Sequence, residues 1–342
     1  MTRFLLHTFP VPTRVAAMAE VCEGDGWDGV LLADSQNLVG DPYCELTLAA
    51  SVTDRLELGP FVTNPVTRHP AVTASAIATV QEESGGRAVV GIGRGDSSLA
   101  LIGRPRATLD QLGTYVDQLR HYLSGEPVEI EGHESRLAWV AESSQPRVPI
   151  DVVASGRRSI SLAAACADRV TFALGASPDR IRWAIDTARA ARSRAGLPSE
   201  TLKVGACLVA AVTSDRDDDA AGMVRANVGI FARFLGQAAA AGGAPDATDL
   251  RTEEAVAAAY NQERHGLASA PQTALLDDDF VRDFAVVGSA DHCVERLTQL
   301  ADTGLDHIVV VGPSRDVDAR EALALTRRFA TEVLPGLRET KP

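Results

Sequence analysis

Short apolar runs alternate along the chain with longer stretches that have helical spacing. The apolar runs cover residues 3–9, 27–33, 56–62, 87–92, 150–154, 168–173, 202–212 and 307–311. The run Trp27–Ala33 (WDGVLLA) has no regular polar alternation, which is typical of a strand buried on both faces of a parallel sheet. At least one helical stretch follows each run. The pattern therefore predicts eight parallel strands separated by helices.

Two connections between these elements are longer than the others. After a helix that starts with a capping box at Thr108 and Gln111, we expect a hairpin that pairs Val128–Ile130 with Leu137–Val140. Residues 213–280 are the least regular part of the chain. They contain helical patterns over residues 216–235 and 252–260, and we expect them to form an insertion that acts as a lid.

Strict alternation of eight strands with helices predicts an α/β fold, the (β/α)₈ TIM barrel, as a single domain over residues 1–342. The competing fold is a doubly wound open sheet, whose glycine-rich turn usually follows the first strand. Here the first strand ends in His7-Thr8-Phe9-Pro10, without glycine. Glycines instead follow the third to sixth strands, as expected when a ring of loops shares one ligand. The barrel is therefore favoured.

Charge and composition narrow the functional classes. Acidic residues outnumber basic ones 46 to 33, which gives a net charge of −13 and argues against nucleic acid or an anionic membrane as the main partner. No apolar run approaches the length of a membrane span, and the N-terminus lacks the apolar segment of a secretory signal. The five cysteines are scattered without a C-x-x-C pair. We expect a cytoplasmic protein.

In a TIM barrel the carboxyl ends of the strands meet at one mouth. The candidate residues at these ends are His7, Asp34, Phe61, Val62, Thr63, Asn64, Gly93, Arg94, Gly95, Asp96, Ser155, Gly156, Arg157 and Gly175. Ser155-Gly156-Arg157 precedes a helix, so its N–H groups and a neighbouring arginine, Arg157 or Arg158, form a candidate anion seat. Ordinary helix entry also explains such a Gly-Arg pair, and Arg94 and Asp96 can equally pair with each other.

The sequence lacks the motifs of several other kinds of site. The glycines Gly91, Gly93 and Gly95 lack the spacing and the Lys-Ser/Thr end of a P-loop. No H-x-H motif is present, and the seven histidines do not pair at metal-ligand spacings, so we expect no metal site. A G-x-S-x-G nucleophile elbow is also missing. A bound organic cofactor would then have to carry the chemistry.

The stretch TNPVTRHPAVTASAIATVQEESGGRAVVGIGRGD, residues 63–96, resembles the luciferase-like superfamily. The resemblance is to the branch of methylenetetrahydromethanopterin reductases and related enzymes that depend on the deazaflavin coenzyme F420. It continues more loosely through residues 152–157 and 287–311. The resemblance implies a TIM-barrel oxidoreductase that binds F420, acts on a small-molecule substrate and forms a homodimer through helices of the early half of the barrel.

The resemblance also implies roles for individual residues. The deazaflavin ring would lie against a bulge with a non-prolyl cis peptide, which falls at Phe61-Val62 by position. Asp34 matches a position that contacts the ring or the hydroxyls of its side chain. The phosphate loop would comprise Gly156 and Arg157, with Gly175 beside it, although Arg157 stands where the family usually has proline. Around the ribityl chain and phosphate, the resemblance places Asn64 and the loop Gly93–Asp96.

Three functional hypotheses follow. The first is hydride transfer between C5 of the deazaflavin and an electrophilic C=C, C=N or C=O bond, with His7 and Asp34 as candidate catalytic residues and His7 as the first candidate proton donor. The second is an FMN-dependent monooxygenase on the same fold, which would consume O₂. The third is a non-catalytic flavin-binding barrel.

Overall fold

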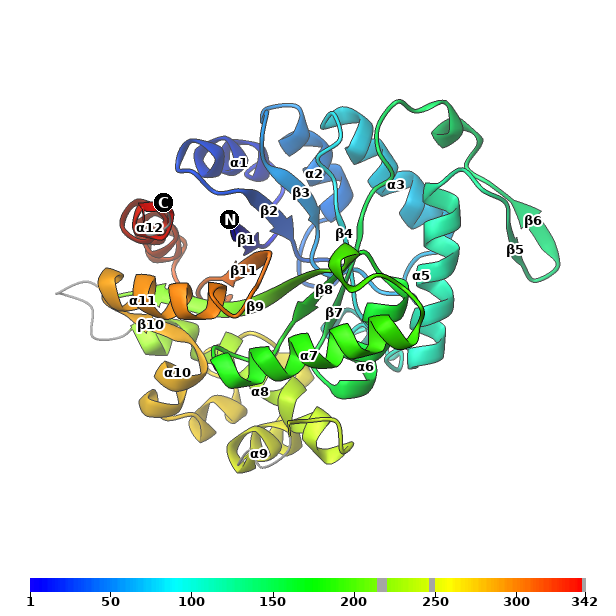
Figure 1. Ribbon diagram of the computed structural model, residues 1–342. Coiled ribbons are helices and arrows are strands. Elements are labelled where there is room, and N and C mark those ends of the chain that lie inside the picture. Colours follow the sequence, from blue (N-terminus) through cyan, green and yellow to red (C-terminus); the bar gives the residue numbers. More distant parts are fainter. Residues whose placement is uncertain (214–219, 246–249, 340–342) are drawn as a thin grey trace.

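Eight parallel strands form a barrel in the computed structural model, which describes residues 1–213, 220–245 and 250–339 (Figure 1). The strands are β1 Arg3–Thr8, β2 Gly29–Leu32, β3 Glu57–Pro60, β4 Val90–Ile92, β7 Ile150–Ala154, β8 Arg169–Phe172, β9 Lys203–Val212 and β11 His307–Val311. They pair in the order β3-β2-β1-β11-β9-β8-β7-β4. Two isolated bridges, Leu58 to Ala88 and Thr63 to Ile92, join β3 to β4 and close the ring. The predicted (β/α)₈ barrel is confirmed.

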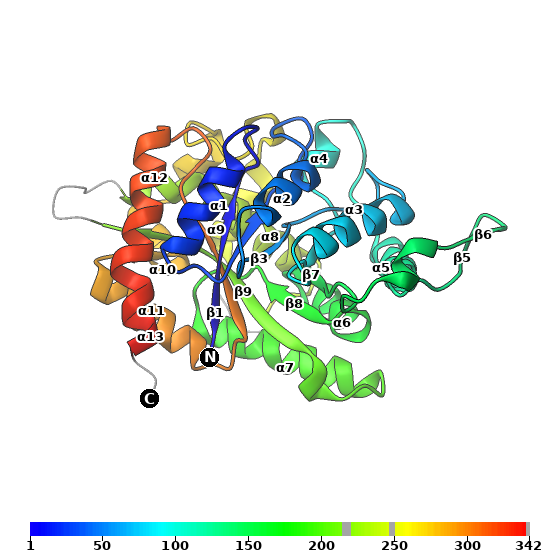
Figure 2. The ribbon, with the colours of Figure 1, turned by 90° about the horizontal axis from the view of Figure 1, so that it is seen from above.

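Helices surround the strands on the outside of the barrel (Figures 1 and 2). In the first half of the chain they are α1 Val15–Gly24, α2 Pro42–Ala50, α3 Pro70–Glu83, α4 Ser97–Ala100, α5 Leu109–Leu123 and α6 Arg157–Cys166. In the second half they are α7 Pro178–Arg194, α8 Ala220–Ala240, α9 Arg251–Ala259, α10 Asp278–Phe284, α11 Ala290–Ala301, α12 Ala319–Arg328 and α13 Leu334–Glu339. In the parts of the chain that the structure describes, no helix is both long and apolar enough to cross a membrane.

The segment expected as an insertion is largely helical. It contains α8 and α9, whereas the predicted first residues 216–219 of its first helix lie outside the described residues. A short strand, β10 Val286–Gly288, which the apolar pattern does not separate from its surroundings, pairs with the end of β9 at Ala210–Val212. β9 is therefore long enough to pair with β11 in the barrel and, past that pairing, with β10.

The prediction is correct for the first strand of the hairpin and wrong for the second. β5 Val128–Ile130 pairs with β6 His133–Ser135, whereas Ala138–Glu142 form a 3₁₀ helix. The two residues between the strands, Glu131 and Gly132, both have positive φ, at 54° and 78°. Such a two-residue turn matches the twist of the strands, so the chain reverses earlier than expected. The hairpin projects from the body of the barrel (Figures 1 and 2).

A buried ion-pair network closes the end of the barrel opposite the mouth. Glu57, which is 6 % exposed, accepts hydrogen bonds from Arg169 at 2.7 and 2.8 Å and from Arg3 at 2.7 Å. Burial opposes ionisation of this carboxyl, but Arg169 and Arg3 outweigh it and lower the pKa of Glu57 from 4.5 to about 2. The network joins three strands, β1, β3 and β8.

Substitution of Glu57 tests this network. Glu57→Gln leaves two arginines without their charge partner, so we expect the free energy of unfolding at pH 7 to fall by about 3 kcal/mol. Because the folded-state pKa lies below the ordinary value, the carboxylate stabilises the fold above pH 4.5, and this contribution is lost as the pH falls toward 2. The difference between variant and wild type, measured by urea denaturation, should shrink over that range.

The matched control is Asp179→Asn, which removes an exposed carboxylate paired with Arg182. Such a surface pair contributes little to stability, so this variant should unfold like wild type. A Glu57→Gln protein as stable as wild type at pH 7 would contradict the assigned role of the network.

Candidate active site

A cavity of about 760 Å³ opens at the carboxyl ends of the barrel strands. Nine of the candidate residues line it: His7, Asp34, Phe61, Val62, Gly93, Arg94, Gly95, Asp96 and Ser155. The insertion contributes Ile230, Phe231 and Phe234 of α8 to the same wall. The other five candidates, Thr63, Asn64, Gly156, Arg157 and Gly175, are not among the lining residues. The structure thus brings most of the predicted residues to one place.

His7 lies near the end of β1 between two aromatic rings. Its imidazole is 5.9 Å from the ring of Phe9 and 5.7 Å from that of Phe61, centroid to centroid and edge to face in both cases. Burial lowers the pKa of His7 from 6.5 to about 4, an effect that the backbone of Phe61 offsets only in part. At neutral pH the ring is therefore uncharged. It is suited to orient a polar group as a neutral hydrogen-bond donor or acceptor.

The implied cis peptide between Phe61 and Val62 is present. It follows directly on β3, where the N–H of Phe61 donates to the carbonyl of Leu32 at 2.7 Å. Glycines on β4 make room for this kinked backbone. A Cβ on Gly91 would lie 2.5 Å from the carbonyl oxygen of Pro60, and one on Gly93 would lie 3.1 Å from Cγ2 of Val62. The bulge expected at the end of the third strand is confirmed.

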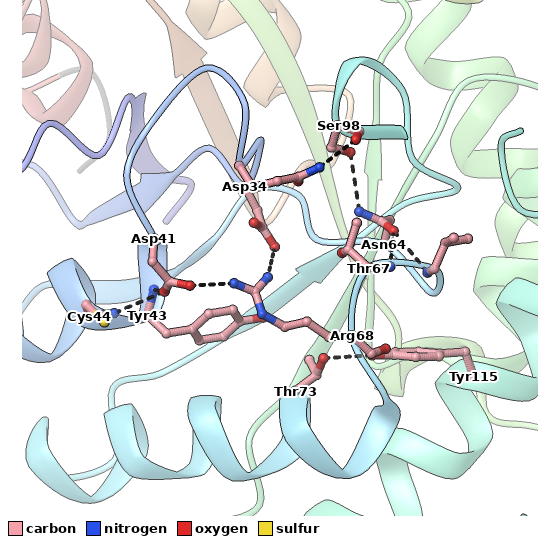
Figure 3. Close-up of polar contacts among 12 residues, drawn as sticks. Asp34, Asp41, Tyr43, Cys44, Asn64, Thr67, Arg68, Thr73, Ser98 and Tyr115 are labelled. Carbon is pink, nitrogen blue, oxygen red and sulfur yellow. Dashed lines mark hydrogen bonds and ion pairs between the residues drawn. The ribbon is translucent and has the colours of Figure 1, made fainter. Parts of the chain in front are cut away.

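Asp34, which follows β2, is held by an arginine from the turn before α3 (Figure 3). Nη1 of Arg68 lies 2.7 Å from Oδ2 of Asp34, and Nη2 lies 2.6 Å from Oδ2 of Asp41. The guanidinium also stacks over the ring of Tyr43, 4.8 Å from its centroid. Burial raises the pKa of Asp34 above its ordinary value, although Arg68 offsets part of the shift. Sequence analysis missed Arg68.

Asn64 shapes the turn that carries Arg68 and does not line the cavity. Its Oδ1 accepts hydrogen bonds from the N–H groups of Val66 and Thr67 at 2.9 and 3.0 Å. Its Nδ2 donates to Oγ of Ser98 at 3.3 Å (Figure 3). The side chain is 1 % exposed. In this structure Asn64 is placed to position the loop, rather than to contact a ligand directly.

Arg94 and Asp96 do not pair with each other, so that alternative is wrong. Nε of Arg94 donates to the carbonyl of Ala107 at 2.6 Å. Asp96 is ion-paired with Arg233 of α8 and accepts a hydrogen bond from Gln262 at 3.2 Å. Burial opposes ionisation of Asp96, but Arg233 and the other cations nearby keep its pKa below the usual value. This buried pair fastens the insertion to the loop after β4.

The start of α6 differs from the expected anion seat. The N–H of Arg157 donates to the carbonyl of Gly243 at 2.7 Å, and the Arg157 guanidinium stacks over Trp183, 5.3 Å from the ring centroid. Arg158, in contrast, lies close enough to Arg94 to add to the effect of burial in lowering the pKa of Arg94. The Arg157 guanidinium thus lies against Trp183, and the anion seat expected at this helix start stays a prediction.

Gly175 packs against α10 and not against the cavity. It has a φ of 73°, and a Cβ there would lie 2.9 Å from the ring and the carbonyl oxygen of Phe284. The next residue, Ala176, donates its N–H to that carbonyl at 2.8 Å. Glycine is therefore required at this position by the left-handed backbone and the close contact.

The cavity fits a tricyclic organic cofactor with a phosphate-bearing side chain. Its floor is apolar, formed by Phe61, Val62 and Ala154, while Asp34, Ser97 and Ser155 supply polar groups around it. Gly95 has a φ of 83°, which favours glycine at this position of the loop. Arg94 lines the cavity as well and supplies a positive charge. Among the described residues, no group of three His, Cys, Asp or Glu side chains is arranged to hold a metal ion.

The family model of the luciferase-like monooxygenases matches residues 3–307. The chain belongs to the luciferase-like monooxygenase family. It is 30 % identical to the 5,10-methylenetetrahydromethanopterin reductase of Methanopyrus kandleri, over 96 % of both chains. To the enzyme of the same name from Methanolobus tindarius it is 27 % identical, over 89 % of this chain and 92 % of that one. The resemblance inferred from residues 63–96 is confirmed.

A solved structure from this luciferase-like family supports the same conclusion. The coenzyme F420 dependent tetrahydromethanopterin reductase from M. kandleri superimposes on this chain with a TM-score of 0.75 and 26 % identity. The match covers 98 % of this chain and 99 % of that one. The two proteins therefore share the barrel and its insertion along their whole length.

Histidine titration tests the electrostatics of the mouth. Burial lowers the pKa of His7 and of His265 to about 4 in each case, so both rings should stay neutral at pH 6. In ¹⁵N NMR of histidine-labelled protein, two imidazoles should keep the shifts of the neutral form down to about pH 5. Their resonances should disappear in His7→Gln and His265→Gln respectively. A His7 resonance with a midpoint above pH 6 would contradict the assigned environment.

Proposed function

We propose that this protein is an F420-dependent oxidoreductase that acts on a small-molecule substrate at the barrel mouth. The observation that carries the proposal is the full-length similarity to the methylenetetrahydromethanopterin reductases, 30 % identity over 96 % of both chains. When bound, the deazaflavin supplies a hydride donor or acceptor at its C5, and the substrate offers an electrophilic C=C, C=N or C=O bond.

The ring of the cofactor would be held by the strand ends. Phe61 and Val62 would support it from the β3 bulge, and Asp34 would hydrogen-bond to its polar edge. The phosphate would bind near Ser155, Gly156 and Arg94. These assignments rest on the cavity lining, which includes Ser155 and Arg94, and on the charge-assisted hydrogen bonds that a guanidinium makes to a phosphate.

His7 and Asp34 would act on the substrate side of the mouth. The neutral imidazole of His7 is a hydrogen-bond donor and acceptor, and it orients the reacting polar group without adding a charge. Burial raises the pKa of Asp34, while Arg68 lies 2.7 Å from its Oδ2 and sets its orientation. We therefore place Asp34 beside His7 as a candidate for proton transfer. Proton delivery by His7, the first candidate from sequence, is less well supported.

The insertion would exclude water and select the substrate. Ile230, Phe231 and Phe234 of α8 line the cavity from the side opposite the strand ends, and the Asp96–Arg233 pair holds them there. Exclusion of water strengthens the electrostatic interactions of a site and protects a hydride donor from side reactions. We therefore assign to residues 220–245 and 250–280 the role of a fixed cover over the mouth.

We further propose that two copies pair through the early half of the barrel. Three large apolar side chains of α2 and α3 and their flanks are exposed: Leu48 at 51 %, Val52 at 38 % and Val72 at 55 %. Exposed apolar side chains that cluster on adjacent helices are typical of an oligomer interface. A cytoplasmic location and the absence of a nucleic-acid partner stay predictions from composition.

Cofactor titration tests the proposed function. We expect the purified protein to bind F420 in a fluorescence titration and to show no comparable affinity for FMN. Arg94→Gln removes a charge-assisted contact to phosphate, so F420 affinity should fall about tenfold to a hundredfold. Arg104→Gln, at an exposed position in the loop that follows, is the matched control and should bind like wild type. Binding of FMN without F420 would favour the monooxygenase hypothesis, which O₂ consumption would then confirm.

Oligomeric state tests the proposed interface. The double variant Leu48→Asp/Val72→Asp places charges on the exposed apolar faces of α2 and α3, and we expect it to sediment as a monomer where wild type sediments as a dimer. Leu197→Asp, at a position 37 % exposed after α7, is the control and should leave the dimer intact. Wild type that sediments as a monomer at micromolar concentration would refute the interface.

A further inference from the structure

Arg68 is shared by two carboxylates, one inside the cavity and one outside it. Its Nη1 lies 2.7 Å from Oδ2 of Asp34, which lines the cavity. Its Nη2 lies 2.6 Å from Oδ2 of Asp41, which is not among the lining residues (Figure 3). The side chain of Asp34 is 2 % exposed, whereas that of Asp41 is 47 % exposed. One guanidinium is thus the ion-pair partner of a buried carboxylate and of an exposed one.

Asp41 is fixed in place by the helix that it caps. Its Oδ1 accepts hydrogen bonds from the N–H groups of Tyr43 and Cys44, at 2.9 and 3.3 Å, at the start of α2 (Figure 3). The N-terminus of a helix stabilises a negative charge on its capping residue. Because Oδ1 is engaged in the cap, Oδ2 is the oxygen that binds the guanidinium of Arg68. Asp41 therefore holds Arg68 from a fixed position.

Arg68 is also held by its ring contact and by its main chain. The guanidinium stacks over the ring of Tyr43, 4.8 Å from the centroid. The carbonyl of Arg68 accepts a hydrogen bond from the hydroxyl of Tyr115 at 3.0 Å, and that hydroxyl also lies 2.7 Å from Oγ1 of Thr73 (Figure 3). These contacts keep the guanidinium between the two carboxylates, so that it pairs with both.

Two carboxylates that share one guanidinium leave one negative charge in excess. The other titratable groups that face this cluster are the hydroxyls of Tyr43 and Tyr115, and burial raises the pKa of each, so neither adds a charge. Ionisation costs more for a buried carboxyl than for an exposed one, and Asp41 has the helix N-terminus to stabilise its charge. A proton that neutralises the excess charge therefore binds to Asp34.

We infer that Asp41 is a positioning residue that competes with Asp34 for the Arg68 guanidinium and so makes Asp34 the carboxyl that takes up a proton at the mouth. The effects on the pKa of Asp34 have the matching directions: burial raises it, Arg68 lowers it, and Asp41 raises it. This inference rests on the proposed function, in which Asp34 is a candidate for proton transfer. A residue outside the cavity thus controls the protonation of a residue inside it.

A pH titration of the full chain without cofactor, followed by ¹³C NMR of its aspartate carboxyl groups, tests this role of Asp41. The resonance of Asp34 is identified by its loss in Asp34→Asn. Asp41→Asn keeps a good N-cap for α2 but removes the competing charge, so the midpoint of Asp34 should fall by about one pH unit. Arg68→Gln removes the cation, so the midpoint should rise by a similar amount. A general loosening of the site would shift both variants in the same direction.

Asp277→Asn is the matched control. Asp277 caps α10 by accepting a hydrogen bond from the N–H of Phe280 at 2.8 Å, and it is not among the lining residues of the cavity. In this variant the midpoint of Asp34 should equal that of wild type. Asp41→Ser, which also provides a good N-cap, should reproduce the fall expected for Asp41→Asn. An unchanged or raised midpoint in Asp41→Asn and Asp41→Ser would overturn the inference.

An F420 titration of the same proteins at several pH values is read separately. Where Asp34 contacts the cofactor, the pH profile of F420 affinity should move down in Asp41→Asn and up in Arg68→Gln, together with the carboxyl midpoint. Carboxyl midpoints that shift as expected in a protein without F420 affinity refute the proposed function alone. F420 affinity with an unshifted midpoint in the Asp41 variants refutes the competition between Asp41 and Asp34 alone.

Discussion

The close approach of β3 to β4 is the constraint on which the mouth of this barrel depends. A Cβ at Gly59 would lie 2.1 Å from the carbonyl oxygen of Val89, and one at Gly91 would lie 2.5 Å from that of Pro60. No side chain fits in that space, so these two glycines allow the ring of strands to close. Closure of the ring of strands places the cis peptide at Phe61-Val62 next to His7. The ring of Phe61 forms part of the cavity floor.

Around this floor, charge is arranged in two buried groups on the loops that follow β2 and β4, which contact each other through Ser35 and Ser97. Asp34 is tied to Arg68 and through it to Asp41, and Asp96 is tied to Arg233. Each carboxylate therefore has its own cation, which reduces the electrostatic cost of burying it. Arg94 lines the cavity as well and adds positive charge to the mouth, which favours an anionic group near it.

Much of the fold was predictable because strands buried on both faces leave continuous apolar runs. Two predicted strands, residues 150–154 and 307–311, match β7 and β11 to the residue. The hairpin failed on its second strand because the turn at Glu131-Gly132 depends on backbone conformation, and apolar spacing does not register it. The apolar pattern predicted the strands correctly where burial determines the structure. It did not predict the hairpin, where the conformation of one turn determines which residues pair.

The site was predictable as a set of strand ends but not as a set of contacts. Arg68 and Arg233 pair with carboxylates 34 and 137 residues away, and nothing in the spacing of either arginine points to its partner. Arg157 was the expected phosphate residue, but its guanidinium stacks on Trp183. Side-chain direction changes by about 100° from one helical residue to the next, and the sequence alone does not show which direction meets the cavity.

The position of Arg233 on α8 has a consequence for how the family can vary. Arg233 is 1 % exposed and stacks 3.9 Å from the ring centroid of Tyr260, while its neighbours Phe231 and Phe234 face the cavity. One helical turn thus holds both the residue that anchors the insertion and residues that line the cavity. A change of side chain at a cavity-facing position would alter the shape of the mouth and leave in place the Asp96–Arg233 pair that holds the helix. Such a helix can diverge on one side and remain constant on the other.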